Sequence, residues 1–511
     1  MRPLYRSCIA FAACLAGCAV GPDYHEPKMK VPDAFGAASG TAVQGKAGPT
    51  GQSVDIAKWW SALNDTELNS LIERAVRANP TLEIALTRLQ EARTFEIAVT
   101  GVALPNLNVS AGGARGTGSN LARGRISPPL NAASNTAGLQ QINYIAGFDA
   151  GWELDLFGRY RRAIEAVHYD TQAAAAARNA VLITVVADVV RAYVDLRGLQ
   201  MQLAVLRQNI KTAQTSLDLE QARFDRGIIN ELDVTLARRQ LATFQSQVAP
   251  LEAQINAAQY AIAVLLGQFP EDIAKELEKP GVVPQVPERV DAGLPLDVIR
   301  RRPDIREAER QLAGATARIG VATADLFPRV ALTAGAGVQG QGLGVTPVVT
   351  KDIWSAGLLA TWPLLDFGTL DALVDVADLR THEMLVNYKR TVLNAVQEVD
   401  NAINGYAAQQ DRLRNLGDAL SASQRAVSLA TQRYDRGLTD YLNVVDAQRQ
   451  EYDLAAQYAS AQMTAAEQFV ALYKGLGGGW EEYQSIPPIR QPQPAVVAAF
   501  RRVLAPEDPL K

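Results

Sequence analysis

The sequence has little of what metal sites, disulfides and enzyme active sites need. Its 511 residues include three cysteines, three histidines and five methionines, and Cys8, Cys14 and Cys18 are all among the first 18 residues. The body of the chain therefore offers no thiol for a disulfide or a metal cluster, and we predict no metal site. It also has no G-x-S-x-G, H-E-x-x-H or Walker motif, so we predict no enzyme, no catalytic residue and no bound cofactor.

Two further absences limit what the chain can contact. The formal net charge is −4, which gives no electrostatic basis for binding nucleic acid. After the first 18 residues, we find no apolar run that approaches the roughly 18–20 residues of a membrane-spanning helix. Any insertion into a membrane should therefore use β-strands or a lipid anchor.

The N-terminus has the pattern of a secretory signal peptide, expected at residues 1–17. Arg2 and Arg6 precede a short run of apolar and small residues that ends Leu-Ala-Gly-Cys at Cys18. This ending resembles the bacterial lipobox, which implies cleavage before Cys18 and acylation of its thiol. Ordinary cleavage with a free Cys18 is the alternative, although an exposed thiol is a liability in an oxidising compartment. Residues 18–60 then read as a tether, rich in Pro, Gly and Ala to about Ser53.

The rest of the chain is an internal duplication. The motif W-E-L-D-L-F-G-R at Trp152 returns as W-P-L-L-D-F-G-T at Trp362, 210 positions later (362 − 152). The pairs Pro80 and Pro303, and Pro105 and Pro328, are instead 223 apart, so the second copy lacks about 13 residues where a loop tolerates deletion. We predict a first repeat at 61–270, a second at 285–480 and a C-terminal tail at 481–511.

Each copy contains two segments with the period-two pattern of a half-apolar strand, expected at 104–116, 143–157, 327–339 and 353–366. Tyr144 and Trp152 are eight residues apart on one apolar face, and so are Trp354 and Trp362. At ~3.3 Å per residue this spacing is about 26 Å, close to the ~25 Å apolar band of an outer-membrane barrel with two aromatic girdles. A soluble sandwich could show the same alternation, but the matched aromatic spacing favours the membrane.

Four strands cannot close a membrane sheet, because open edges would leave backbone N–H and C=O groups without partners. The barrel must then be shared between copies: two would give eight strands with a filled interior, and three would give twelve with a lumen. The residues alone leave this choice open. The Gly-, Ser- and Asn-rich segments Arg115–Ile142 and Gln339–Asp352 are expected as the outer loops.

The remaining sequence predicts very long helices. Between Leu182 and Leu217 apolar residues step by three and four without a break, a 3.5-residue period that indicates a left-handed coiled coil. The pattern returns more weakly between Val392 and Val427. No proline interrupts residues 158–226, enough for a rod of about 100 Å. Pro250 should bend the helix that follows the Gly227 turn.

These motifs together resemble the outer membrane factor family of TolC-like efflux ducts, in its NodT-type lipoprotein branch. The resemblance rests on the lipobox and G-P-D-Y, on Trp59-Trp60, on R-R-P-D-I-R-E-A-E from Arg301, and on Y-D-R-G-L-T-D-Y-L-N-V-V-D-A-Q from Tyr434. It implies an α+β membrane protein: a homotrimer with a shared 12-stranded transmembrane β-barrel, four strands per chain, continuous with a periplasmic α-helical coiled-coil barrel.

The resemblance also implies a function. Such a duct exports small molecules, for example antibiotics, together with a periplasmic adaptor and an inner-membrane RND-type pump. It would be in the cell outer membrane, with N-acyl and diacylglyceryl lipid on Cys18, and Ala19 after the cysteine fits outer-membrane sorting. Two other functions remain: a structural coiled-coil lipoprotein of the outer membrane, and a duct for protein secretion.

Two sites are implied by the family. The first is an adaptor-docking tip at the two helix–helix turns, although these could be turn residues only: Gly227, Ile228, Ile229, Gly437, Leu438 and Thr439. The second is a periplasmic gate in which Asp446 forms a ring of carboxylates, unless it is only a solvated helix-face residue. Asn443 stands where some relatives carry a second Asp, and its repeat mate is Asp233. Tyr434 and Arg436 are expected to brace the closed tip.

Overall fold

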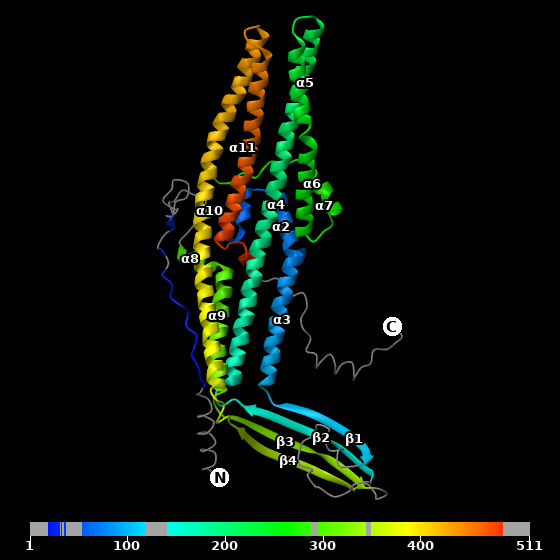
Figure 1. The fold of residues 1–511 in the computed structure, drawn as a ribbon, viewed down its shortest axis with the longest axis vertical. Coiled ribbons are helices and arrows are strands. Elements are labelled where there is room, and N and C mark those ends of the chain that lie inside the picture. The colour runs from blue at the N-terminus through cyan, green and yellow to red at the C-terminus, as the bar shows by residue number, and fades with distance from the viewer. Residues whose placement is uncertain are drawn as a thin grey trace. The chain divides into compact units, whose positions relative to one another are not determined.

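A computed structural model describes residues 19–30, 32, 35–36, 54–117, 140–287, 290, 295–343 and 349–483. It contains long helices and one four-stranded sheet (Figure 1). The elements are η2 (Ile56–Leu63), α2 (Thr66–Ala78), α3 (Pro80–Val102), β1 (Asn106–Thr117), β2 (Gln140–Leu154), α4 (Arg159–Asp225), α5 (Glu231–Gln245), α6 (Val248–Leu265), α7 (Pro270–Leu277), α8 (Pro295–Arg301), α9 (Pro303–Ala324), β3 (Arg329–Leu343), β4 (Val349–Thr361), α10 (Thr369–Asp435), α11 (Tyr441–Gly475) and η4 (Glu481–Tyr483). The predicted signal peptide, Cys18, the whole β1–β2 loop and the tail after Tyr483 lie outside the described residues.

The duplication is visible in the helices themselves. Helices α4 and α10 each have 67 residues, and both their first and their last residues are 210 positions apart. Three pairs of glycines with positive φ show the same offset: Gly158 and Gly368, Gly227 and Gly437, Gly267 and Gly477. The repeated sequence therefore builds a strand pair followed by a 67-residue helix twice.

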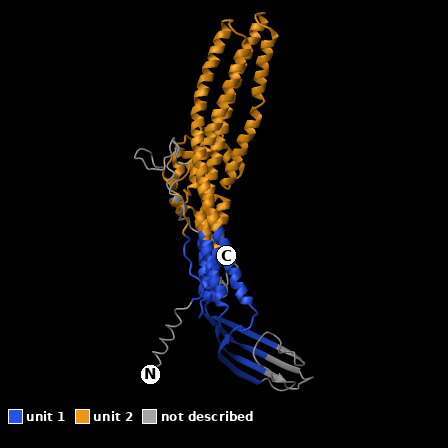
Figure 2. Ribbon diagram, turned by 60° about the vertical axis from the view of Figure 1, so that its left-hand side comes forward, with its two compact units in different colours: residues 1–27, 91–172, 309–386 blue, residues 28–90, 173–308, 387–511 orange. Residues whose placement is uncertain are grey.

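The chain forms two compact units that do not follow the repeat (Figure 2). Unit 1 comprises residues 1–27, 91–172 and 309–386, and it contains the sheet with the helix segments next to it. Unit 2 comprises residues 28–90, 173–308 and 387–511, and it contains the turns between the long helices. Each unit takes segments from both copies, so neither copy forms a compact body alone.

The sheet of unit 1 is an antiparallel meander in the order β1-β2-β3-β4, and every strand boundary is within five residues of its predicted position. Its register places Val109, Phe148, Ala336 and Trp354 in one row across the four strands. Large apolar side chains are exposed on that face, while Asn108 on the other face donates to the Asp149 carboxylate at 3.0 Å. The strands therefore present one apolar and one polar face, as their alternation predicted.

The last tryptophan of each strand pair makes the same bond in both copies. The Trp152 indole donates to the carbonyl of Ala103 at 3.1 Å, and the Trp362 indole donates to the carbonyl of Leu326 at 3.0 Å. Ala103 lies in the turn between α3 and β1, and Leu326 lies in the turn between α9 and β3. These two residues, predicted only as girdle aromatics, therefore also fix the helix-to-strand turns.

The core of unit 2 follows the coiled-coil stripe of α4. Apolar residues at its three- and four-residue steps are buried, among them Leu182, Val185, Val189, Leu196, Leu206 and Ala213. The Trp59-Trp60 pair of η2 also enters this core, where the Trp59 ring stacks on Tyr473 at a centroid distance of 5.7 Å. The coiled-coil prediction is confirmed, and the segment around Trp59 belongs to the core.

Two expectations about the helices need correction. Helix α4 does contain an 18-residue window apolar enough to span a membrane, but 56% of that window is buried in the structure. Packing in the core accounts for this composition. Pro250, which we expected to bend one helix, lies in the first turn of α6, so α5 and α6 are separate helices. A proline is tolerated there because its missing N–H has no partner in a first turn.

We predict that Trp362→Phe lowers the free energy of unfolding by about 1 kcal/mol, the usual net value of one hydrogen bond. Urea titration of the purified protein in detergent measures this loss. Trp354→Phe is the matched control, because the Trp354 side chain is 82% exposed. Equal losses in the two variants would show that the indole–carbonyl bond contributes nothing.

Candidate functional site

Two turns of the same construction lie at one end of unit 2, between α4 and α5 and between α10 and α11 (Figure 1). In the first, Gly227 has φ +71° and donates to the Phe224 carbonyl at 2.7 Å, while Ile228 donates to the Arg223 carbonyl at 3.0 Å. The Gly437 turn repeats both bonds. This is a Schellman motif, which requires a left-handed residue after the helix. A Cβ added at either glycine meets open space, so φ alone demands glycine.

The turns expose apolar side chains in matched pairs. Ile228 and Leu438 are 67% and 63% exposed, and Leu232 and Leu442, at the start of the next helices, are 60% and 55% exposed. The members of each pair are 210 positions apart. Ile229 and Thr439 are half-buried against the turns. Each turn therefore offers a small apolar surface next to its glycine, which suits docking of another protein.

A cluster of polar side chains, here called the bracket, joins the two copies of the repeat close to these turns; it consists of Glu220, Arg223, Tyr434 and Asp435. The Tyr434 hydroxyl donates to Glu220 at 2.5 Å, and the Arg223 guanidinium contacts Asp435 at 3.1 Å and lies 5.0 Å from the Tyr434 ring centroid. The Glu220 side chain is only 1% exposed, and burial raises the pKa values of both Glu220 and Tyr434. The bracing role predicted for Tyr434 has contacts that suit it.

The arginine of that bracket is one that the sequence did not single out. We expected Arg436 beside Tyr434, but Arg436 is exposed next to the Gly437 turn, and Arg223 makes the contact. The hydrogen-bond partner of Tyr434 comes from the other copy, 214 positions away. A contact across the duplication has no signal in local spacing, so only the structure could reveal it.

The predicted gate residues cluster near the same turns. Asp446 is exposed on α11 and accepts a hydrogen bond from the Gln450 amide at 2.9 Å. Asn443 is exposed one turn earlier, and its amide donates to Thr439 at 2.7 Å. Asp233 is half-buried in the first turn of α5, and burial, followed by the charge of Asp440, raises its pKa. The role of these residues in a gate stays a prediction.

A pair of carboxyl groups that the sequence did not indicate lies further along the bundle. Asp195 of α4 and Glu467 of α11 are hydrogen-bonded to each other. Burial, followed by the bond to Asp195, raises the pKa of Glu467 to about 7, while the charge of Arg191 opposes the shift. Two carboxyl groups in hydrogen-bond contact share a proton. Their contact is therefore favourable only while one of them is protonated.

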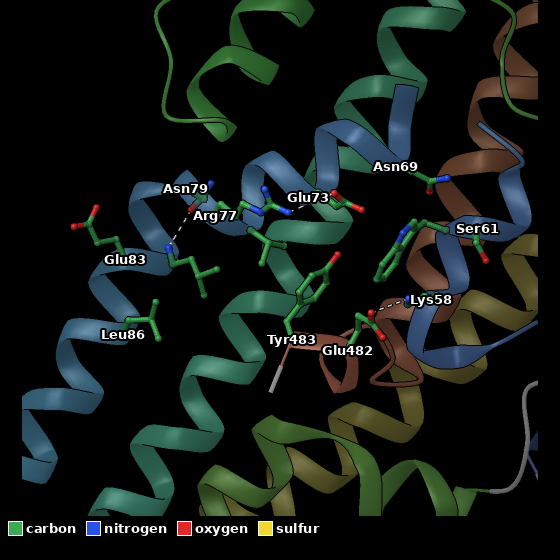
Figure 3. A pocket seen from close by; sticks show the side chains of 13 residues that line it. Lys58, Ser61, Asn69, Glu73, Arg77, Asn79, Glu83, Leu86, Glu482 and Tyr483 are labelled. Carbon is green, nitrogen blue, oxygen red and sulfur yellow. Dashed lines mark hydrogen bonds and ion pairs between the residues drawn. The ribbon is translucent and has the colours of Figure 1, made fainter. Parts of the chain in front are cut away.

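A cavity of about 640 Å³ opens beside η2, α2 and α3 (Figure 3). Four of its charged side chains pair with one another: Lys58 with Glu482 at 2.7 Å, and Arg77 with Glu73 at 3.7 Å. This pairing neutralises most of the charge that could select a substrate. Across the described residues, no three His, Cys, Asp or Glu side chains gather as metal ligands. The predicted absence of a metal and a cofactor stays a prediction.

The sheet with one exposed apolar face and the duplicated coiled-coil helices define a class: membrane channels built from β-strands and long helices. A family profile described as "Outer membrane efflux protein" matches residues 71–268 and 294–478, and the chain belongs to this family. It is an efflux channel of the cell outer membrane, as the sequence motifs predicted.

Relatives and a solved structure agree with this assignment. Nodulation protein T of Rhizobium leguminosarum bv. trifolii is 30% identical over 476 residues, 92% of this chain and 96% of that protein. The toluene efflux pump outer membrane protein TtgC of Pseudomonas putida is 30% identical, over 92% of this chain and 94% of that protein. The structure of the outer-membrane channel OprN matches with a TM-score of 0.78 and 33% identity, over 91% of this chain and all of OprN. The TolC-like α+β fold is therefore confirmed.

The carboxyl pair predicts a pH-dependent stability. Folding raises the pKa of Glu467 from its ordinary value of 4.5 to about 7. The free energy of unfolding therefore falls as the pH rises from about 4.5 through about 7, and the contribution of this group is greatest at the acidic end of that range. We expect a lower melting temperature at pH 8 than at pH 6. Glu467→Gln should reduce this difference by keeping the pair from carrying two charges. An unchanged pH dependence in the variant would assign it to other groups.

Proposed function

We propose that this chain is the exit duct of a tripartite efflux system, in which three copies close one channel across the outer membrane. The observation that carries the proposal is the four-stranded sheet, whose β1 and β4 each have a neighbour on one side only within the chain. Unpaired backbone groups are too costly in lipid, so these edges must pair between copies. Three copies give twelve strands and a lumen, whereas two give a filled barrel.

The partners follow from the same architecture. A duct in the outer membrane has no energy source, so it needs an inner-membrane pump, of the RND type, and a periplasmic adaptor to reach it. The names of relatives, such as the toluene efflux pump outer membrane protein TtgC, support small molecules as cargo. A duct for whole proteins is the second candidate within this fold, and no residue described above favours it.

The apolar turns are the surface that we assign to the adaptor. Leu438→Glu should weaken adaptor-dependent export roughly tenfold, because a charge at the centre of a small apolar contact costs more than about 1.4 kcal/mol. Antibiotic susceptibility and cross-linking to the adaptor measure the effect. Leu429→Glu is the control, since Leu429 is 51% exposed on α10 but outside the turn. Equal defects in the two variants would remove the turn from the docking surface.

Asp446 is the residue that we assign to the gate. Three copies of Asp446 around a channel axis would form a ring of charge that narrows the pore and favours cations. Asp446→Ala should therefore raise single-channel conductance in planar bilayers and reduce cation selectivity. Asp418→Ala provides the control, because Asp418 is also exposed but lies 17 residues before the end of α10. Wild-type conductance and selectivity in Asp446→Ala would contradict the gate assignment.

Cys18 lies outside the described residues, and we propose that it carries the N-acyl and diacylglyceryl lipid. The support is the Leu-Ala-Gly-Cys ending of the signal sequence. Several acyl chains would hold the mature N-terminus in the outer membrane, since each buried CH₂ contributes ~0.8 kcal/mol.

A further inference from the structure

The first described residues after Cys18 are held against unit 1 by a buried arginine. The side chain of Arg162, in the first turn of α4, is 7% exposed. Its guanidinium donates to the carbonyls of Val20 and Gly21 at 3.2 and 3.3 Å and to the Asp23 carboxylate at 2.7 Å. The Val20 N–H donates in turn to the Phe157 carbonyl at 3.1 Å. Four hydrogen bonds therefore fix this segment to the junction between β2 and α4.

The fit of the segment depends on close backbone contacts. Gly21 has φ +90°, and a Cβ there would lie 2.4 Å from the Gly320 Cα of α9. Gly158 has φ +84°, and a Cβ there would lie 2.7 Å from the Ala19 Cα. Both glycines therefore leave space for the opposing backbone. Residues 19–24 therefore lie along the surface of unit 1 in close backbone contact with it.

Tyr24 secures the far end of the segment. Its hydroxyl donates to Glu309 of α9 at 2.8 Å, and its ring meets the edge of Tyr169 at a centroid distance of 6.0 Å. The segment is therefore held at both ends as well as at its centre. Its contacts come from both copies, because α4 belongs to the first and α9 to the second.

We infer that residues 19–24 form a rigid tie that holds the lipid-bearing end of the chain at the strand–helix junction, so that the acyl chains and the membrane strands enter the bilayer at one fixed depth. The inference rests on the proposed lipidation of Cys18. A flexible tether of about 40 residues would let the lipid range over roughly 35 Å. Here one peptide bond separates Cys18 from Ala19, which contacts Gly158.

With this tie, the lipid on Cys18 does more than retain the chain in the outer membrane. The indole of Trp152 lies at the same junction, bonded to the Ala103 carbonyl. With the lipid placed there, its glycerol end marks the plane at which the strands leave the membrane. The acyl chains then set the depth to which the strands insert into the bilayer while β1 and β4 pair with strands of other copies.

The test compares one insertion on either side of the tie in the full-length protein. A Gly-Ser linker of about eight residues after Ala19 keeps Ala19 next to Cys18 but frees the lipid from the junction. The same linker after Met29 leaves the tie intact. Pulse-labelling follows the appearance of the heat-modifiable, SDS-resistant oligomer in outer membranes. We expect it to form roughly tenfold more slowly with the linker after Ala19 and at the wild-type rate with the linker after Met29.

A point substitution checks these backbone contacts without changing chain length. Gly21→Val should undock the segment and slow oligomer formation as the first linker does. Gly36→Val is its control, because a Cβ at Gly36 meets nothing within 4 Å. Normal assembly of Gly21→Val would overturn the tie.

Labelling with radioactive palmitate distinguishes a failure of the proposed lipidation of Cys18 from a failure of the tie formed by residues 19–24. If wild-type protein takes up no label and Cys18→Ser matches it, the lipidation fails and the tie fails with it. If Cys18 is labelled but both linkers give the same rate, the tie alone is overturned. Efflux activity of the wild type, measured in parallel, tests the duct separately.

Discussion

Everything in this molecule depends on the cost of an unpaired backbone hydrogen-bonding group in lipid. The chain builds a four-stranded sheet with an exposed apolar face, and within one chain β1 and β4 are its edges. In water such edges would be tolerable, but in a bilayer each open N–H and C=O costs several kcal/mol. The sheet is therefore incomplete by design, and association of copies becomes part of folding. The anchored N-terminus and the paired turns act in an assembly that this requirement creates.

The duplication supplies the parts, and the function depends on where the two copies differ. Tyr434 of the second copy bonds Glu220 of the first, whereas their repeat mates, Phe224 and Ala430, have no polar side-chain atoms for such a bond. Pro250 divides α5 from α6, but its mate lies within the uninterrupted α11. The first copy has Asp233 where the second has an asparagine. The differences at Tyr434 and Asp233 lie near the turns that we assign to docking and gating, and the break at Pro250 lies further along the returning helix.

Much of the fold could be predicted from the sequence because it is encoded locally. The alternation around Phe148 and Trp354, the 3.5-residue stripe from Leu182 and the recurrence at 210 positions are all readable from spacing. The chemistry between distant segments could not be predicted. Neither the contact of Arg223 with Tyr434 nor the pairing of Asp195 with Glu467 has a local pattern. The composition of the segment after Cys18 predicted a tether, because it offers no core residues. In the structure the N–H groups of Arg162 hold this segment, and Gly21 and Gly158 leave room for its close backbone contacts.

The break at Pro250 has a mechanical consequence. Of the two hairpins that reach the turns, one has a jointed return helix and the other has a single rod of 35 residues. In a ring of three such chains, compliant and stiff hairpins would alternate. Bending at this break would move the first-copy turn relative to the second-copy turn, at three places around such a ring. The turn next to Asp233 would then be the one that shifts, whereas the uninterrupted helix α11 that carries Asp446 would stay straight.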